Sequence, residues 1–292
     1  MTAAAQNELV GRLTGPSDAR GPGAREAEML KANVVANFAF FRRSRLLMAF
    51  ALAFLLLTGL SSLPALFTDS GVQSFNALQE IFSNLNVFIL FLAGGLGLFI
   101  ISSHLRSRSL KMVFTKPCSP ALWLGSAMLS AAIVSLLLTG VVLTSAVVLS
   151  FVWKIPVRAG LVFIAMETFV ASLGIIAYMM LLATLVHPAI AVTLVLIFNA
   201  DMFYAVQIWT QAAIRAGNSS LSLRVLERIF HGLYLILPMI RTFDKETEGI
   251  YSSFRVMHGE WKYVLYSLGY AVTLSAFCYF VALFALQRKR HI

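Results

Sequence analysis

Charge is scarce in this 292-residue sequence. Only 12% of the residues are charged, whereas an ordinary soluble domain carries about a quarter. Hydrophobic residues make up 59% of the chain, and its mean hydropathy is +0.82. The shortage of charge excludes an ordinary water-soluble enzyme fold, because so many apolar residues exceed what a water-surrounded core takes up. It predicts instead that much of the chain lies in a bilayer.

Residues for disulfide, metal and phosphate chemistry are equally scarce. Two cysteines, Cys118 and Cys278, are too few for a disulfide framework, and the five histidines lack metal-ligand spacing. No G-x-x-x-x-G-K-[ST] segment occurs, so the chain has no phosphate-cradling loop for ATP. No Ser/His/Asp arrangement suggests a catalytic centre. We therefore expect no catalytic residues, no metal and no cofactor in this chain.

The charge that is present is mostly positive. Lys and Arg total 23 against 13 Asp and Glu, which gives a net charge of +10. In a soluble protein this balance would suggest nucleic acid. Here the positive residues lie in the gaps between apolar runs, so we expect contacts with anionic lipid headgroups and no nucleic-acid partner.

Long apolar runs are what the sequence has in abundance. A membrane-spanning helix needs about 20 apolar residues, and six segments qualify: 46–67, 85–103, 122–152, 159–186, 188–209 and 263–286. Indole rings favour the headgroup level, and all four tryptophans fall at predicted span ends, at Trp123, Trp153, Trp209 and Trp261. The sequence predicts an all-α integral protein of the cell (plasma or inner) membrane with six transmembrane helices, the membrane domain covering 46–290.

The residues before the first span divide into two parts. Residues 1–28 are polar and rich in Ala, Gly and Pro, which predicts a flexible cytoplasmic tail. Over 29–45, Leu30, Val34, Phe38 and Phe41 recur at helical spacing among Lys, Arg and Asn. This pattern predicts an amphipathic helix lying in the membrane interface, with a simple extension of the first span as the alternative.

Positive charge predicts the orientation. The loop between the first two spans has no Lys or Arg, and the next loop on that side has only Lys154 and Arg158. The basic N-terminal flank, the 104–120 loop and the closing Arg288-Lys289-Arg290 lie on the other side. Cytoplasmic flanks and short loops carry the excess of positive charge, so both termini are expected inside.

The 210–262 segment, expected outside the membrane, contains an apolar stretch from Val225 to Leu237 that ends at Pro238. The stretch is too short to cross comfortably, which favours a re-entrant or interfacial helix. The alternative is a seventh, short span, which would reverse the direction of the last helix.

The 104–120 loop interleaves basic and apolar residues, a pattern typical of a docking element for lipid or protein. The residue before Pro117 avoids helical geometry, so a short amphipathic helix would end there. On composition alone the loop is a positive-inside anchor. The candidate docking residues are Arg106, Arg108, Leu110, Lys111, Phe114, Lys116 and Pro117.

This loop and the chain end resemble those of ABC-2-type transporter permeases. The loop runs from Leu105 through Thr115-Lys116-Pro117-Cys118-Ser119 into Leu124-Gly125. Leu237-Pro238 followed by Phe243-Asp244, and the basic tail Gln287–Arg290, are similar to segments around the last span of that family. The family often has an acidic residue near the start of the loop helix, where this chain has Arg106 and Arg108.

The resemblance implies a mechanism and partners. Such permeases work as two permease subunits, alike or related, with two cytoplasmic ABC ATPase subunits. ATP and Mg are then expected on the partner ATPase, whose closure pushes on the loop helix and the N-terminal interfacial helix. The resemblance implies that this chain is the membrane subunit of an exporter. The loop residues named above would then couple the permease to its ATPase.

Two carboxyl groups lie within predicted spans, Glu167 in the fourth and Asp201 in the fifth. Each is eight residues from the predicted outer end of its span, about 12 Å at 1.5 Å per residue. A charge in hydrocarbon is costly, so both should face protein or a watery cavity, which they would line with Thr168, Asn199 and Tyr204. The alternative is helix–helix hydrogen bonding with one carboxyl protonated.

Two other functions remain open. The carboxyl pair would suit a proton- or cation-coupled secondary carrier, and the basic loop would suit a non-transporting membrane anchor of a larger complex. A stripe of small residues in the third span, Ala127, Ala131, Ser135 and Thr139, predicts close helix packing without a site.

Overall fold

The computed structural model describes residues 22–43, 71–106, 119–197, 200–216, 221–236, 249–250 and 252–290, and within 44–70 only residues 48, 51–52, 54–56 and 58–59. In this part of the chain the regular structure is entirely helical. The helices are α2 (Pro22–Arg43), α4 (Gly71–Arg106), α6 (Pro120–Val152), α7 (Ala159–Leu185), α8 (Pro188–Ile197), α9 (Ala200–Arg215), α10 (Leu221–Ile236), a 3₁₀ turn η1 (His258–Glu260) and α12 (Trp261–Arg290).

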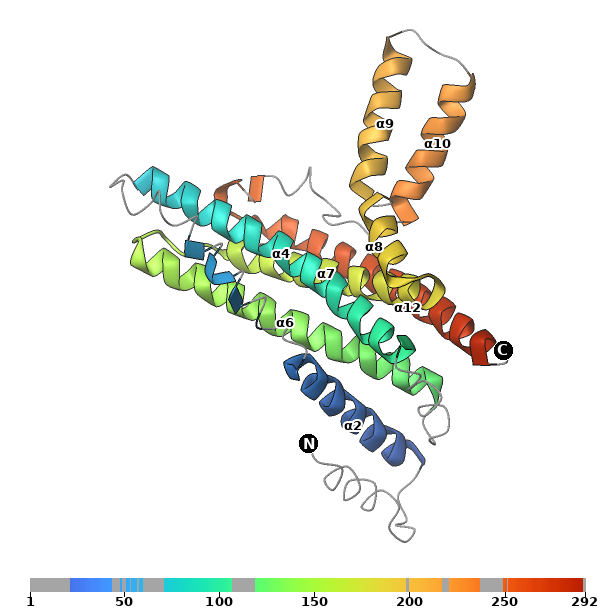
Figure 1. The fold of residues 1–292 in the computed structure, drawn as a ribbon. Coiled ribbons are helices and arrows are strands. Elements are labelled where there is room, and N and C mark those ends of the chain that lie inside the picture. Colours follow the sequence, from blue (N-terminus) through green and yellow to red (C-terminus); the bar gives the residue numbers. More distant parts are fainter. Residues whose placement is uncertain are drawn as a thin grey trace.

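Four of the described helices are long and apolar enough to cross a membrane. They cover Ser74–Ser103, Pro120–Val152, Ala159–Leu185 and His258–Arg288. Together they form one elongated bundle (Figure 1). The chain is therefore an all-helical protein whose helices suit a multi-pass membrane protein.

The helix α7 occupies the centre of this bundle, in contact with α4, α6 and α12. On one side, Gly94 of α4 lies against Ile175 and Met179 of α7, and further along α4 a Cβ on Gly97 would be only 2.8 Å from the carbonyl oxygen of Ile176. Because later residues of α4 meet later residues of α7, the two helices run parallel. Glycine is required at 97, since this approach leaves no room for a side chain.

The last helix, α12, also runs parallel to α7. Near the start of both helices the Phe163 ring meets the Trp261 ring, and further along both helices Gly174 lies against Leu274. The Ser275 hydroxyl also donates to the carbonyl of Leu173 at 3.4 Å. Towards the other end of the bundle the Tyr279 hydroxyl of α12 donates to the carbonyl of Ala121 at 2.8 Å, which ties α12 to the start of α6.

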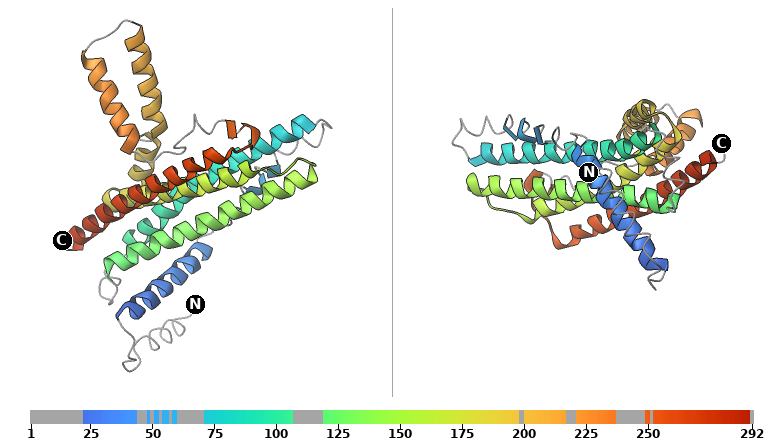
Figure 2. Two further views of the ribbon diagram at one scale, coloured as in Figure 1. Left: turned by 180° about the vertical axis from the view of Figure 1, so that it is seen from behind. Right: turned by 60° about the horizontal axis from the view of Figure 1, so that its bottom comes forward.

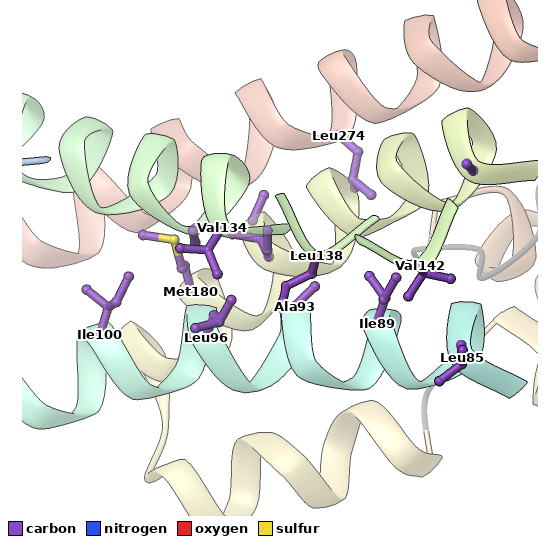
Figure 3. Close-up of a cluster of buried hydrophobic side chains, with 14 of the residues drawn as sticks. Leu85, Ile89, Ala93, Leu96, Ile100, Val134, Leu138, Val142, Met180 and Leu274 are labelled. Carbon is purple, nitrogen blue, oxygen red and sulfur yellow. The ribbon is translucent and has the colours of Figure 1, made fainter. Parts of the chain in front are cut away.

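The core between α4 and α6 is a ladder of aliphatic side chains. Figure 3 shows Ile89, Ala93 and Leu96 of α4 facing Val142, Leu138 and Val134 of α6 in the opposite order. The reversed order shows that these two helices are antiparallel. The residues on α4 recur every three or four positions, so the buried stripe follows one helix face.

The small-residue stripe of α6 packs within the chain. Ala127, Ala131 and Ser135 are fully buried and Thr139 is nearly so, and the Ser135 hydroxyl donates to that of Ser172 on α7 at 2.7 Å. The helix begins where the sequence provides a cap: Pro120 follows Ser119, whose side chain accepts a hydrogen bond from the Leu122 amide at 3.1 Å.

The predicted start of the second span, at residue 85, was wrong. Residues 71–84, assigned to a loop, form the first turns of α4, because Leu78, Ile81 and Phe82 recur at helical spacing and bury. Within the predicted span 188–209 the structure describes α8 and α9, and residues 198–199 between them lie outside the described part. A crossing by this segment stays a prediction. Trp209 lies within α9, and its place at a span end stays a prediction. The predicted span 46–67 lies largely outside the described residues.

The helices outside the bundle fall into two groups. At the N-terminal end, α2 covers the predicted 29–45 helix and starts earlier, so residues 22–28 of the predicted flexible tail are helical. It lies against α6 (Figure 1). The other group is a hairpin of α9 and α10, which stands away from the bundle in two views (Figure 2, left). In it α10 forms the helix predicted before Pro238; its place in or on a membrane stays a prediction.

Candidate functional site

Glu167 is a carboxyl group inside the bundle. It lies two turns into α7 and is only 3% exposed. Burying an ionised carboxylate costs several kcal/mol unless partners compensate it, so the surroundings of Glu167 decide its protonation. The sequence predicted that Glu167 faces either protein or a watery cavity, and the structure buries it within the bundle.

The face of α7 that carries Glu167 is the face that packs on α12. Gly160 and Gly174 each lie seven residues from Glu167, which is two helical turns, and therefore share its face. Gly160 lies against the backbone of Phe254, and Gly174 lies against Leu274. Glu167 precedes Gly174 by seven residues, and Ser267 precedes Leu274 by seven residues. Because α7 and α12 are parallel, Glu167 and Ser267 therefore lie at one level of the α7–α12 interface.

Ser267 is unusual for a buried hydroxyl. It is 2% exposed, and its Oγ has no hydrogen-bond partner among the described residues. By contrast, serines elsewhere in the bundle donate to helix carbonyls, as Ser150 does to Ala146 at 2.8 Å. A buried polar group left without a partner costs about 1–3 kcal/mol. Ser267 thus provides an unused hydroxyl at the level of the carboxyl.

A second polar position lies at the same level on the opposite side of α7. Gly94 of α4 lies against residues 175–179 of α7. Because the two helices are parallel, Asn86, eight residues before Gly94, lies level with residues 167–171 of α7. That stretch includes the buried Thr168. Asn86 is 4% exposed, and neither its Oδ1 nor its Nδ2 has a hydrogen-bond partner within the described parts of the chain. One level of the bundle therefore carries a carboxyl, a carboxamide and two hydroxyls.

The other predicted substrate-path residues are not placed beside Glu167. Asn199 lies outside the described residues. Asp201 and Tyr204 belong to α9, and the surroundings of their side chains are not described. Figure 1 shows α9 rising away from the bundle. A cavity shared by Glu167 and Asp201 therefore stays a prediction.

The predicted docking loop is described only at its edges. Arg106 ends α4, and Arg108, Leu110, Lys111, Phe114, Lys116 and Pro117 lie outside the described residues. The end of the bundle that carries this loop is described, and α2 packs there. The Asn37 amide of α2 donates to the Ser130 hydroxyl of α6 at 3.1 Å, and the Phe40 and Phe99 rings stack with centroids 5.0 Å apart.

Sequence reasoning missed Asn86 and Ser267 as members of the polar level. Asn86 stood just inside a predicted span, where amide side chains are uncommon, and that position was the available signal. Ser267 carried no such signal, because α12 also contains Ser275 and only the packing of α12 on α7 distinguishes the two. No group of three or more His, Cys, Asp or Glu in the described chain is arranged to hold a metal ion.

No protein-family profile, curated protein or solved structure matches the chain.

Proposed function

We propose that this protein is the membrane subunit of an ABC-2-type exporter, driven by ATP hydrolysed on a separate cytoplasmic ATPase subunit. The proposal rests on the resemblance of the 104–120 loop and the chain end to such permeases. The structure supplies a bundle of helices suited to crossing a membrane with polar groups buried inside it.

One structural observation carries the proposal furthest, namely the packing of α2 on the bundle. The Asn37–Ser130 hydrogen bond, the stacked Phe40 and Phe99 rings and the full burial of Phe41 join α2 to α6 and α4. These are the two helices that the 107–118 segment connects. A partner that pushes on α2 and on this segment would move both helices together, because interiors are close-packed and transmit strain.

In this proposal, the polar level around Glu167 lines the path of the substrate through the bundle. Its carboxyl, carboxamide and hydroxyl groups lie in an otherwise apolar bundle, and polar groups inside membranes commonly mark substrate or ion pathways. In the proposed cycle, movement of α4 and α6 relative to α7 and α12 opens this level to one side of the membrane and then to the other. Two copies of the chain, or this chain and a related one, complete the transporter.

The first experiment is purification of the chain in mild detergent after co-expression with its neighbouring genes, with mass spectrometry of what stays bound. A bound ABC ATPase at a one-to-one ratio supports the proposal. An intact complex without an ATPase contradicts it.

The loop is tested by the double variant Phe114→Ala, Pro117→Ala. We expect ATP hydrolysis to continue while transport falls, because the docking contact is lost and the protein stays in the membrane. Leu136→Ala, at an exposed position in the middle of α6, is the matched control and should leave coupling intact. Undiminished coupling in the double variant would remove the loop from the mechanism.

A second candidate is a proton- or cation-coupled carrier that uses Glu167, favoured by the burial of this carboxyl. Flux that follows an ion gradient and ignores ATP would select it. A non-transporting anchor would be selected if Glu167→Gln and the loop variant both left flux unchanged.

A further inference from the structure

The short segment before α12 is held in an unusual way at one end of the bundle. The described residues 249–250 and 252–257, here termed the strap, lie at the end of the bundle where α4, α7 and α12 begin. Ile250 and Phe254 are buried, while Met257 is exposed. Phe254 has a backbone φ of 51°, in the left-handed region that non-glycine residues rarely adopt. Such conformations persist only where the surroundings over-determine them.

The contacts of Phe254 hold it in this conformation. Its ring packs edge-on against Phe75 and Phe82 of α4, with centroids 5.5 and 6.0 Å away. Its carbonyl accepts a hydrogen bond from the Gly160 amide of α7 at 3.0 Å. The preceding carbonyl, of Ser253, accepts from the Arg158 guanidinium, which also lies 5.4 Å over the Phe75 ring. The strap thus joins α4 to α7.

Gly160 is the point at which the strap meets the bundle. A Cβ at this position would lie 2.6 Å from the Cα of Phe254, so only glycine allows the strap to close against α7. Glu167 lies on the same face of α7, seven residues further along, about 10 Å away at 1.5 Å per residue. Between them, the Phe163 ring meets the Trp261 ring edge-on with centroids 5.5 Å apart. The strap and these two rings therefore lie between this end of the bundle and the level of Glu167 and Ser267.

We propose that the strap is a latch, closed in this structure, that controls the access of water to the buried level of Glu167 and Ser267. The conformation of Phe254 is strained and depends on a few contacts with α4 and α7. A small separation of these two helices would remove the contacts and release the strap. The latch belongs to the fold itself, so the proposal stands whether or not the chain is an exporter subunit.

The test is chemical labelling of carboxyl groups in the full-length chain in lipid nanodiscs, where both ends of the bundle face water. A water-soluble carbodiimide with taurine as the amine modifies carboxyl groups that water reaches, and peptide mass spectrometry locates them. Glu80 of α4, which is exposed, is the internal control. In the native chain we expect Glu80 to be modified and Glu167 to be protected.

Two variants open the latch from opposite sides. Phe254→Ala removes the ring held by Phe75 and Phe82, and Gly160→Ala forces the strap off α7. In each, modification of Glu167 relative to Glu80 should rise at least about tenfold, because local opening then needs less free energy. Phe277→Ala, which removes an exposed ring of α12, should leave Glu167 protected. Arg158→Ala, a milder change at a half-buried position, should give a smaller rise and serves if the other two fail to fold.

Two results would overturn the proposal. If Glu167 is modified as readily as Glu80 in the native chain, no latch closes over it. If Glu167 stays protected in folded Phe254→Ala, Gly160→Ala and Arg158→Ala proteins, the strap does not control access. The assay contains no ATP and no ATPase, so its failure is separate from failure of the proposed transport function.

Discussion

At the scale of single residues, the bundle carries polar side chains in its buried interior. Glu167, Asn86, Thr168 and Ser267 share one level and are each at most 5% exposed. The carboxyl was recognisable in the sequence, because an acidic residue in an apolar run stands out. Thr168 was predicted beside it, and the position of Asn86 inside a predicted span was a usable signal. Ser267 could be assigned to this level only through helix register, which one sequence does not provide.

A first prediction concerns the charge at Glu167. Glu167→Gln keeps the size and polarity of the side chain and removes its ability to ionise, so we expect stability within about 1 kcal/mol of the native chain. Glu167→Lys places a cation in the buried interior of the bundle, and should cost about 2–4 kcal/mol. Thermal unfolding in nanodiscs measures both. Equal stability of the two variants would show that the position tolerates charge.

A second prediction concerns two glycines of α4 that differ only in what they face. Gly97→Ala should destabilise the chain by about 1–3 kcal/mol, because the new methyl group meets the Ile176 carbonyl oxygen at 2.8 Å. Gly95→Ala meets nothing within 4 Å and should be neutral or stabilising by up to about 1 kcal/mol, since alanine favours a helix. Chemical or thermal unfolding of the two variants in parallel checks the opposite signs.

At the scale of elements, apolar length predicted the helices well and their ends less well. The third, fourth and sixth predicted spans correspond to α6, α7 and α12, because uninterrupted apolar runs leave the backbone no other way to satisfy its hydrogen bonds in lipid. The start of α4 was missed since its first turns are amphipathic, with Gln79 and Glu80 beside Leu78 and Ile81.

A third prediction concerns the attachment of α2. Phe41 is fully buried, whereas Val35 on the same helix is 60% exposed. Phe41→Ala should loosen α2 at a cost of about 3–5 kcal/mol, and trypsin should then cut faster at Arg25 and Lys31. Val35→Ala is the matched control and should leave the cutting rate unchanged. The digestion rates, followed by gel electrophoresis, decide the matter.

At the scale of the whole molecule, the parallel direction of α7 and α12 constrains the path of the chain. These helices point the same way, although 72 residues separate the last residue of α7 at Leu185 from the start of η1 at His258. The intervening residues must therefore return from one end of the bundle to the other. One further membrane crossing between α7 and α12 would achieve this return. If α9 and α10 each crossed the membrane, the chain would instead come back to the side on which α7 ends.

The fourth prediction is a test of this return. His187 follows α7 and Met257 precedes α12, and both are exposed. In a background with Cys118→Ser and Cys278→Ser, His187→Cys and Met257→Cys should react with a membrane-impermeant thiol reagent from opposite sides of the membrane. Intact and permeabilised cells distinguish the sides. Labelling of both from one side would contradict the parallel arrangement of α7 and α12 across the bilayer.

The pairing of α7 with α12 also has a consequence for biosynthesis. Glu167 and Ser267 are 100 positions apart in the chain, so at about 5–20 residues per second the ribosome adds Ser267 roughly 5–20 s after Glu167. During that interval α7 resides in the membrane without the helix that covers its acidic face. Glu167 must then be neutral, or be shielded by another protein, until α12 arrives. The order of synthesis thus makes the last helix the step that completes the bundle.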